Sequence, residues 1–171
     1  MKEFIRGTFN TMYSGQAEFG GNFPVWARVK ELYQGGGRID HTKFAAGTVI
    51  GAGTPVVFAG PGKDVKIVAG PAYSESSKYK QGDIVKQSNK YYEAKQNIDS
   101  PEAFQAGKWT DITTAVNGFI FEDVLIPEGC TLATCGVVRA GRIYADRVIG
   151  AEILPAMETR LNQVIEFTRE G

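Results

Sequence analysis

Residues 44–68 read FAAGTVIGAGTPVVFAGPGKDVKIV, and this stretch indicates the fold class. Its runs of β-branched and apolar residues are separated by glycine-containing turns and lie at 48–50, 55–58 and 65–68. Short runs of this composition between glycine turns are typical of strands. Pro55 fits the first position of a strand, because proline donates no hydrogen bond to a ladder. The stretch therefore predicts a small β-meander.

The C-terminal third of the chain continues this pattern and adds one helix. Residues 119–126 and 131–143 are predicted strands, joined by a Pro-Glu-Gly turn at 127–129. Pro155 opens a short helix, since the first helical turn does not need the N–H that proline lacks. Residues 164–168 predict a closing strand. The expected fold class is mainly β with one or two short helices (α+β), built as a small β-barrel or β-meander domain.

Residues 1–43 combine glycines with isolated aromatic residues. Ordering glycine costs backbone entropy, and scattered aromatic side chains need a surface to pack against. The segment therefore predicts an extended N-terminal arm that becomes ordered on a partner, with residues 24–33 (PVWARVKELY) as its strand. The alternative, that this segment packs on its own domain, stays open.

Residues 74–112 differ in composition from the segments on either side. They are polar and hold six lysines and six acidic residues, as a solvated excursion from a main domain would. Residues 83–86 and 91–95 are predicted strands of a hairpin that turns at 87–90. The expected organisation is an arm at 1–43, a β domain at 44–73 and 113–171, and an inserted β module at 74–112.

The chain of 171 residues is 43% hydrophobic, and its 19 Lys and Arg balance 19 Asp and Glu. A neutral chain has no net field that attracts it to nucleic acid or to an anionic membrane, so neither is an expected partner. The sequence has no run of 18 apolar residues and no signal-peptide pattern, which predicts synthesis in the cytoplasm.

No group of residues predicts an active site. Glu122 and Asp123 are adjacent acids, and neighbours in a strand point to opposite faces. His41 is the single histidine and is expected at the surface or at an interface. Cys130 and Cys135 are expected to be small buried residues without a disulfide, since a continuous strand places them on opposite faces. The sequence predicts neither an enzyme nor a cofactor or metal site.

In two segments the turn and core residues follow the order of motifs that a known protein family shares. The first matches G-T-V-I-x-A-G-T-P-V at Gly47, Thr48, Val49, Ile50, Ala52, Gly53, Thr54, Pro55 and Val56. The second matches a G-x-[IV]-x-x-x-R-[LV] turn, a helix led by proline and a final I-x-F-like strand at Gly141, Ile143, Arg147, Val148, Pro155 and residues 164–167. Together they resemble the tailed-phage head decoration proteins and the related head fibre proteins.

This resemblance implies a compact β-rich domain that assembles as a homotrimer on the outer surface of a phage capsid. It implies a virion structural protein that binds the major capsid protein and stabilises or decorates the shell. In that family the N-terminal arm often pairs with capsid strands by main-chain strand addition. The candidate capsid-contact residues are Pro24, Val25, Trp26, Ala27, Arg28, Val29 and Tyr33.

The inserted residues match Y-x-x-G-D-x-V at 79–85, followed by N-K-Y-Y-E-A-K at 89–95, Pro101 and Trp109. They resemble the small chitin- and cellulose-binding modules, in which exposed aromatic rings pack against sugars. Gln96 and Asn97 stand where those modules commonly carry further aromatic residues. The candidate glycan contacts are Tyr79, Tyr91, Tyr92, Phe104 and Trp109.

Two features of these aromatic residues leave their role open. Trp109 also fits the main core residue of a module with so little apolar area. Tyr91 and Tyr92 are strand neighbours that point to opposite faces, so at most one of them joins a binding platform. The alternative function is a glycan-binding adhesion protein that acts through 74–112, with host or mucosal glycans as partners.

Overall fold

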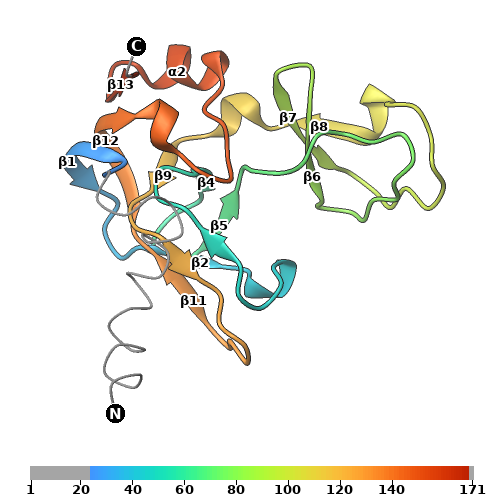
Figure 1. Cartoon of the computed structure of the whole chain (residues 1–171), viewed down its shortest axis with the longest axis horizontal. Coiled ribbons are helices and arrows are strands. Elements are labelled where there is room, and N and C mark those ends of the chain that lie inside the picture. Colours follow the sequence, from blue (N-terminus) through green and yellow to red (C-terminus); the bar gives the residue numbers. More distant parts are fainter. Residues whose placement is uncertain (1–23, 170–171) are drawn as a thin grey trace.

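The computed structural model describes residues 24–169, which form thirteen strands, one α-helix and four short 3-10 helices (Figure 1). The strands are β1 (Trp26–Leu32), β2 (Gly37–Ile39), β3 (Val49–Ile50), β4 (Pro55–Phe58), β5 (Asp64–Ile67), β6 (Ile84–Gln87), β7 (Lys90–Ala94), β8 (Trp109–Asp111), β9 (Gly118–Ile120), β10 (Val124–Leu125), β11 (Ala133–Cys135), β12 (Val137–Tyr144) and β13 (Ile165–Thr168). The helices are η1 (His41–Lys43), η2 (Ala106–Lys108), η3 (Thr113–Ala115), η4 (Ala145–Arg147) and α2 (Pro155–Leu161). The mainly β class with a short helix is as predicted.

Eight strands form one curled sheet in the order β1-β12-β9-β4-β5-β2-β11, and β13 pairs in parallel with β12. Only Gly136 separates β11 from β12, so one nearly continuous segment stands at both ends of this order. Through β11 it pairs with β2, and through β12 it pairs with β1 and β9. The sheet therefore closes back towards itself around its core. The predicted β4–β5 hairpin is present, whereas β3 pairs with β10 in a separate small sheet.

Two apolar clusters stabilise the main domain. One is formed mainly by alternate residues of the strands of this sheet, with Ile50 of β3 and Ile126 after β10 added to them. Its members are Ile39, Ile50, Val56, Phe58, Val65, Ile67, Ile120, Ile126, Ala133, Cys135 and Val137. Gly37 allows β2 to approach this cluster, because a Cβ there would lie 2.0 Å from the side chain of Val65. The strand pairing and the cluster thus depend on each other at β2.

The second cluster holds α2 against the main sheet beside β12 and β13 (Figure 1). Pro155 occupies the start of α2, as its sequence predicts, and Met157 and Leu161 are the buried residues of the helix. They pack with Val68, Tyr91, Ile112, Val116, Phe119, Val138, Ile143, Ile153, Leu154 and Ile165. The predicted closing strand is β13, which begins one residue later than expected.

The structure corrects the prediction that residues 1–43 form a separate arm. β1 pairs with β12 from Trp26↔Ile143 to Leu32↔Val138, and β2 lies between β5 and β11. Trp26 and Tyr33, the aromatic residues of this segment that the structure describes, have partners within the chain: Trp26 donates to the carbonyl of Ile120 (3.2 Å) and Tyr33 to that of Asn117 (3.2 Å). The open alternative, packing on its own domain, is therefore correct for β1 and β2. Residues 1–23 of the predicted arm lie outside the described residues.

The predicted strand over residues 119–126 is interrupted. β9 ends at Ile120 and β10 begins at Val124, and the chain bends at Phe121 and Glu122 between them. The Asp123 carboxylate accepts a hydrogen bond from the Ala52 N–H (2.7 Å), and burial raises the pKa of Asp123 against the lowering effect of this bond. A contact with a residue 71 positions away cannot be read from local periodicity.

Residues 74–112 contain a three-stranded sheet, β6-β7-β8, that projects from one side of the main domain (Figure 1). The hairpin between β6 and β7 turns at Ser88 and Asn89, whose φ angles of 49° and 58° suit a two-residue turn. The sheet has a core of its own, made of Tyr79, Val85, Ala94, Ile98 and Trp109. We call this unit, residues 74–112, the module.

The two cysteines are expected to differ in reactivity at pH 8. Both are free; burial raises the pKa of Cys135 to about 11, which leaves roughly a thousandth of that thiol as thiolate. Cys130 is half-buried between β10 and β11. Iodoacetamide is expected to alkylate Cys130 quickly and Cys135 slowly. The Cys130→Ser variant, which keeps only Cys135, should therefore be labelled slowly, as measured by intact mass. Equal rates at both thiols in the folded protein would contradict the burial of Cys135.

Candidate functional site

The core of the module is a group of aromatic rings around Trp109. The Phe104 ring stacks on Trp109 with centroids 5.7 Å apart, and the Tyr79 ring meets Trp109 edge-on at 5.2 Å. Tyr73, which precedes the module, stacks on Tyr79 at 5.3 Å. Aromatic pairs in these geometries stabilise each other by about 0.5–1.5 kcal/mol beyond their burial. The rings therefore hold the small module together.

The five predicted glycan contacts lie in different environments. Tyr91 and Trp109 are each 2% exposed, and Tyr79 is 9% exposed. Tyr92 and Phe104 are half-buried, and their ring centroids lie 5.0 Å apart. Of the five, Tyr92 and Phe104 thus offer accessible ring surface, while the other three fill apolar cores.

Trp109 is a core residue of the module, as the small apolar area of the module favours. Its indole Nε1 is buried and has no hydrogen-bond partner among the described residues. The rings of Tyr73 and Tyr79 stand at 89° and 76° to the indole plane and enclose it. Trp109 therefore has no open face for a sugar in this structure.

Tyr91 joins the module to the main domain. Its ring belongs to the main-domain cluster that includes Met157 and Leu154, although β7 belongs to the module sheet. The Tyr91 hydroxyl accepts from the Glu152 N–H (3.1 Å), and the Tyr91 N–H donates to the Thr113 hydroxyl (2.9 Å). Burial raises the pKa of Tyr91, so its hydroxyl stays neutral. The prediction that Tyr91 and Tyr92 face opposite sides is correct.

Two ion pairs cross the same boundary, Lys66 with Glu93 at 2.6 Å and Lys86 with Glu152. Partly exposed pairs contribute little stability by themselves, and they fix orientation where a buried contact already exists. Together with Tyr91 they give the module one defined position on the main domain.

The predicted capsid contacts on and beside β1 divide between the core and the surface. Val25, Trp26, Val29 and Tyr33 are half-buried against their own domain, while Pro24, Ala27 and Arg28 are exposed. The Tyr33 hydroxyl donates to the Asn117 carbonyl (3.2 Å), and the Tyr33 ring packs on Phe58 at 4.5 Å. The four half-buried residues therefore stabilise the fold, and only Pro24, Ala27 and Arg28 are accessible to another molecule.

The outer edge of β1 is poorly suited to adding a strand. Among the described residues β1 pairs only with β12, and that pairing has three register shifts. Arg28, Lys30 and Glu31 are exposed along it. Irregular register and charged side chains are features that protect sheet edges from pairing. Contact through β1 would therefore use side chains rather than backbone.

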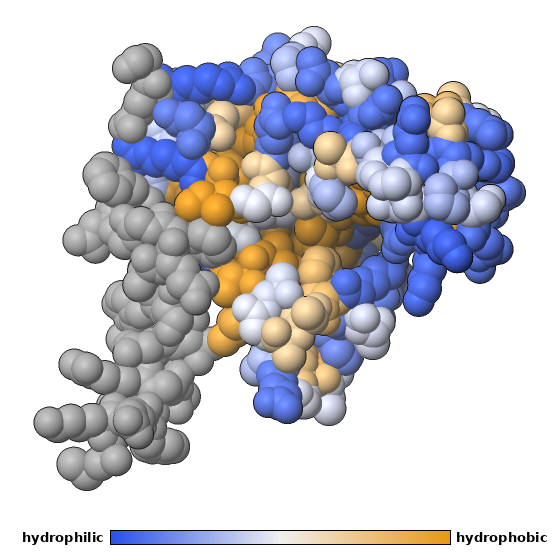
Figure 2. Space-filling view, turned by 45° about the vertical axis from the view of Figure 1, so that its right-hand side comes forward, coloured by the Kyte–Doolittle hydropathy of each residue, from blue (hydrophilic) through white to orange (hydrophobic). Residues whose placement is uncertain are grey.

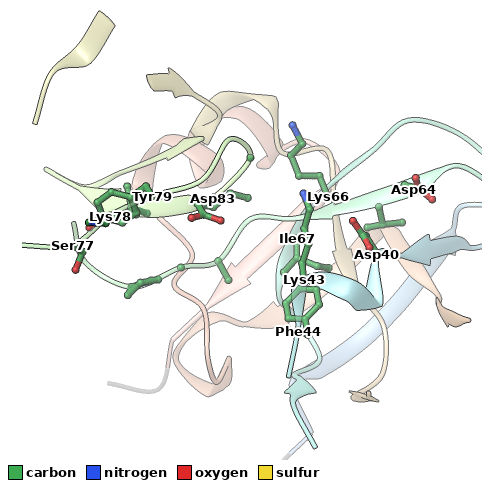
Figure 3. A pocket seen from close by; sticks show the side chains of 17 residues that line it. Asp40, Lys43, Phe44, Asp64, Lys66, Ile67, Ser77, Lys78, Tyr79 and Asp83 are labelled. Atoms are coloured by element: carbon green, nitrogen blue, oxygen red, sulfur yellow. The ribbon is translucent and has the colours of Figure 1, made fainter. Parts of the chain in front are cut away.

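A cleft of about 580 Å³ lies where the module meets the main domain (Figure 3). The main domain contributes Asp40, Lys43, Phe44 and residues 64–67 and 69–71, and the module contributes residues 77–79 and 82–85. Figure 2 shows hydrophobic surface beside the mostly hydrophilic module. Ligand sites favour such junctions and such volumes.

Charged groups of both signs surround this cleft. Asp64 pairs with Arg38 (3.1 Å), and Asp40 accepts from the Thr42 hydroxyl (2.5 Å), a bond that lowers the pKa of Asp40. Lys43 and Lys78 have no ion-pair partner among the described residues. The rim as a whole carries no large excess of either charge.

The other sequence candidates form no common site among the described residues. Glu122 is exposed and Asp123 is half-buried, and His41 is half-buried in η1. Within residues 24–169, no three His, Cys, Asp or Glu side chains gather as a metal site would require. No helix in that range is long and apolar enough to cross a membrane.

Comparisons of the chain with known protein families, curated proteins and solved structures found no match. Sequence reasoning found the aromatic residues but missed the cleft. Its walls come from segments up to 45 positions apart that carry no shared motif. No local signal could have indicated it.

Removing the Tyr91 hydroxyl is expected to weaken the joint between module and main domain. Tyr91→Phe removes the acceptor of the Glu152 N–H, a part-buried hydrogen bond whose loss costs about 1 kcal/mol in the free energy of unfolding. Tyr92→Phe is the matched control, because the Tyr92 hydroxyl has no hydrogen bond among the described residues. Urea unfolding followed by circular dichroism measures both. Equal stability of the two variants would contradict this role for Tyr91.

Proposed function

We propose that the protein is a virion structural protein, a capsid decoration or head fibre subunit that binds the outer surface of a phage capsid. The main domain acts as the base that meets the major capsid protein and other copies of the chain, as a homotrimer. The module is the part displayed outward. The motif resemblance of the main-domain residues supports this proposal, and the observed β-rich architecture is compatible with it.

The observation that carries the proposal is that specific contacts attach the module to the main domain in one defined position. A buried tyrosine, its two hydrogen bonds and two ion pairs hold a separate small sheet on one side of the curled main domain. A module that was only tethered would need none of these contacts. A base with a rigidly presented lobe suits a subunit that is repeated over a large surface.

The contact surface would use exposed side chains of the main domain. Pro24, Ala27 and Arg28 are the accessible members of the predicted capsid contacts. A contact of standard size buries about 1,600 Å² in total, so residues beyond these three would take part. Binding to the shell would then stabilise each subunit by mass action.

Light scattering and co-sedimentation test this function. We expect a solution mass of three times the 18.6 kDa of one chain, and co-sedimentation with shells assembled from the major capsid protein of the same genome. Arg28→Glu reverses an exposed charge of β1 and is expected to weaken sedimentation, whereas Lys63→Glu, away from β1, is the control. A monomer that stays in the supernatant would refute the proposal.

A second candidate function is glycan adhesion through the module. The contact of the accessible Tyr92 and Phe104 rings favours it, because two adjoining rings can pack against the C–H groups of a sugar. Repetition on a shell would make weak single contacts useful through multivalency. A Trp109 variant would not test this function, because replacing this buried core residue disturbs the whole module.

Tyr92→Ala is the informative variant for adhesion. It removes accessible ring surface from the module while Trp109 and Tyr79 keep the core. If the module binds glycans, retention on a glycan array is expected to fall at least tenfold for this variant and to stay unchanged for Tyr33→Phe in the main domain. Absence of retention by the parent protein would exclude adhesion.

A further inference from the structure

Two arginines stand directly opposite each other on β1 and β12. Arg28 is the ladder partner of Arg142, and both residues are exposed. Directly opposed residues of antiparallel strands point to the same face of the sheet, with Cβ atoms about 4.5–5.5 Å apart, and like charges at such positions lower stability. The free chain therefore holds two positive side chains in an unfavourable arrangement.

The packing of the backbone fixes this arginine pair. Gly141 has no room for a Cβ, which would meet the carbonyl of Arg28, so the glycine lets β1 approach β12 closely beside Arg28. The adjacent pair, Val29↔Gly141, faces the other side of the sheet, and Val29 packs there against the cluster that holds α2. Arg28 is therefore held on the solvent-facing side together with Arg142.

Only one of the two arginines is neutralised within the described chain. Arg142 forms an ion pair at 2.8 Å with Glu166, its ladder partner on β13. The side chains of Arg28 and of Lys30, which is exposed on the same strand, have no ion-pair partner among the described residues. The strands β1, β12 and β13 together carry four basic and two acidic residues, although the whole chain is neutral. These strands thus have a local positive excess.

The exposed side chains of Arg28, Lys30 and Arg142 form what we call the basic face. The strands that carry it lie together on one side of the main domain, and the module projects from the opposite side (Figure 1). A partner bound to the basic face would therefore leave the module directed away from that partner.

We propose that the basic face binds carboxylates of an acidic segment on the surface of a partner protein. Arginine binds carboxylate in a planar two-point geometry, and a carboxylate between Arg28 and Arg142 would offset the repulsion of the pair. Glu31 and Glu166 belong to the same strands and would repel a continuous row of phosphates, which favours single carboxylates over nucleic acid or an anionic membrane. The inference deepens the proposed capsid contact through β1 and rests on it for the identity of the partner.

The stability of the free protein tests the opposed charges. Arg28→Gln removes one positive charge and keeps a long polar side chain. Its urea midpoint is expected to exceed that of the parent at about 10 mM NaCl, and the gain is expected to shrink at about 0.5 M NaCl, because salt screens exposed charges. Lys63→Gln, at an exposed position between β4 and β5, is the matched control and should show no such gain. A lower or unchanged midpoint for Arg28→Gln would overturn the proposal.

Binding of hexaglutamate tests the occupant. The capped peptide carries a fluorophore, and its anisotropy is measured with the full-length protein at low salt. Arg28→Gln is expected to weaken binding by about tenfold or more, because a charge pair is lost. Arg28→Lys is expected to weaken it less, because lysine keeps the charge but lacks the planar fork. Lys63→Gln should leave binding unchanged, and hexaglutamine should not bind.

Three results of the binding experiment would overturn the proposal. The first is that the parent protein does not bind hexaglutamate, and the second is that Lys63→Gln weakens binding as much as Arg28→Gln does. The third is tighter binding of hexathymidylate or of phosphatidylserine vesicles that Arg28→Gln abolishes, which would assign the basic face to phosphates. None of these measurements involves shells, so their failure is separate from failure of co-sedimentation.

Discussion

The main domain depends on the pairing of one segment, β11 with β12, to strands on both of its sides. β12 holds β1 along one edge and β9 and β13 along the other, while β11 holds β2. The segment thus connects the first strand of the described chain to the last. Gly136 and Gly141 lie in it where neighbours come close; a Cβ on Gly141 would lie 2.4 Å from the Arg28 carbonyl. Without this segment neither apolar cluster would be enclosed.

The module adds a second level of organisation to this domain. Its aromatic core makes it a separate sheet, yet Tyr91 takes part in the core of the main domain. This division creates the cleft, because the joint is firm at Tyr91 while the walls separate beside it. The position of the module and the cleft beside it therefore follow from the same joint.

Several elements could be predicted from local sequence because their signals are local. Pro55 begins β4, Pro155 begins α2, and the turn at Ser88 and Asn89 joins β6 to β7. The polar composition of 74–112 indicated an insertion, and the structure has a separate sheet there. The predicted arm was wrong for β1 and β2, since glycines and scattered aromatic residues look the same whether their partner is another chain or the same one.

By itself the sequence determined the mainly β class, the short helix and the aromatic residues of the module, since strand runs, prolines and glycine turns act over a few residues. Only the tertiary structure decided which aromatic rings are accessible. Tyr91 and Tyr92 are adjacent in sequence, yet one is buried against the main domain and the other is half-exposed. Burial depends on the neighbours that distant segments provide, and local pattern contains no information about them.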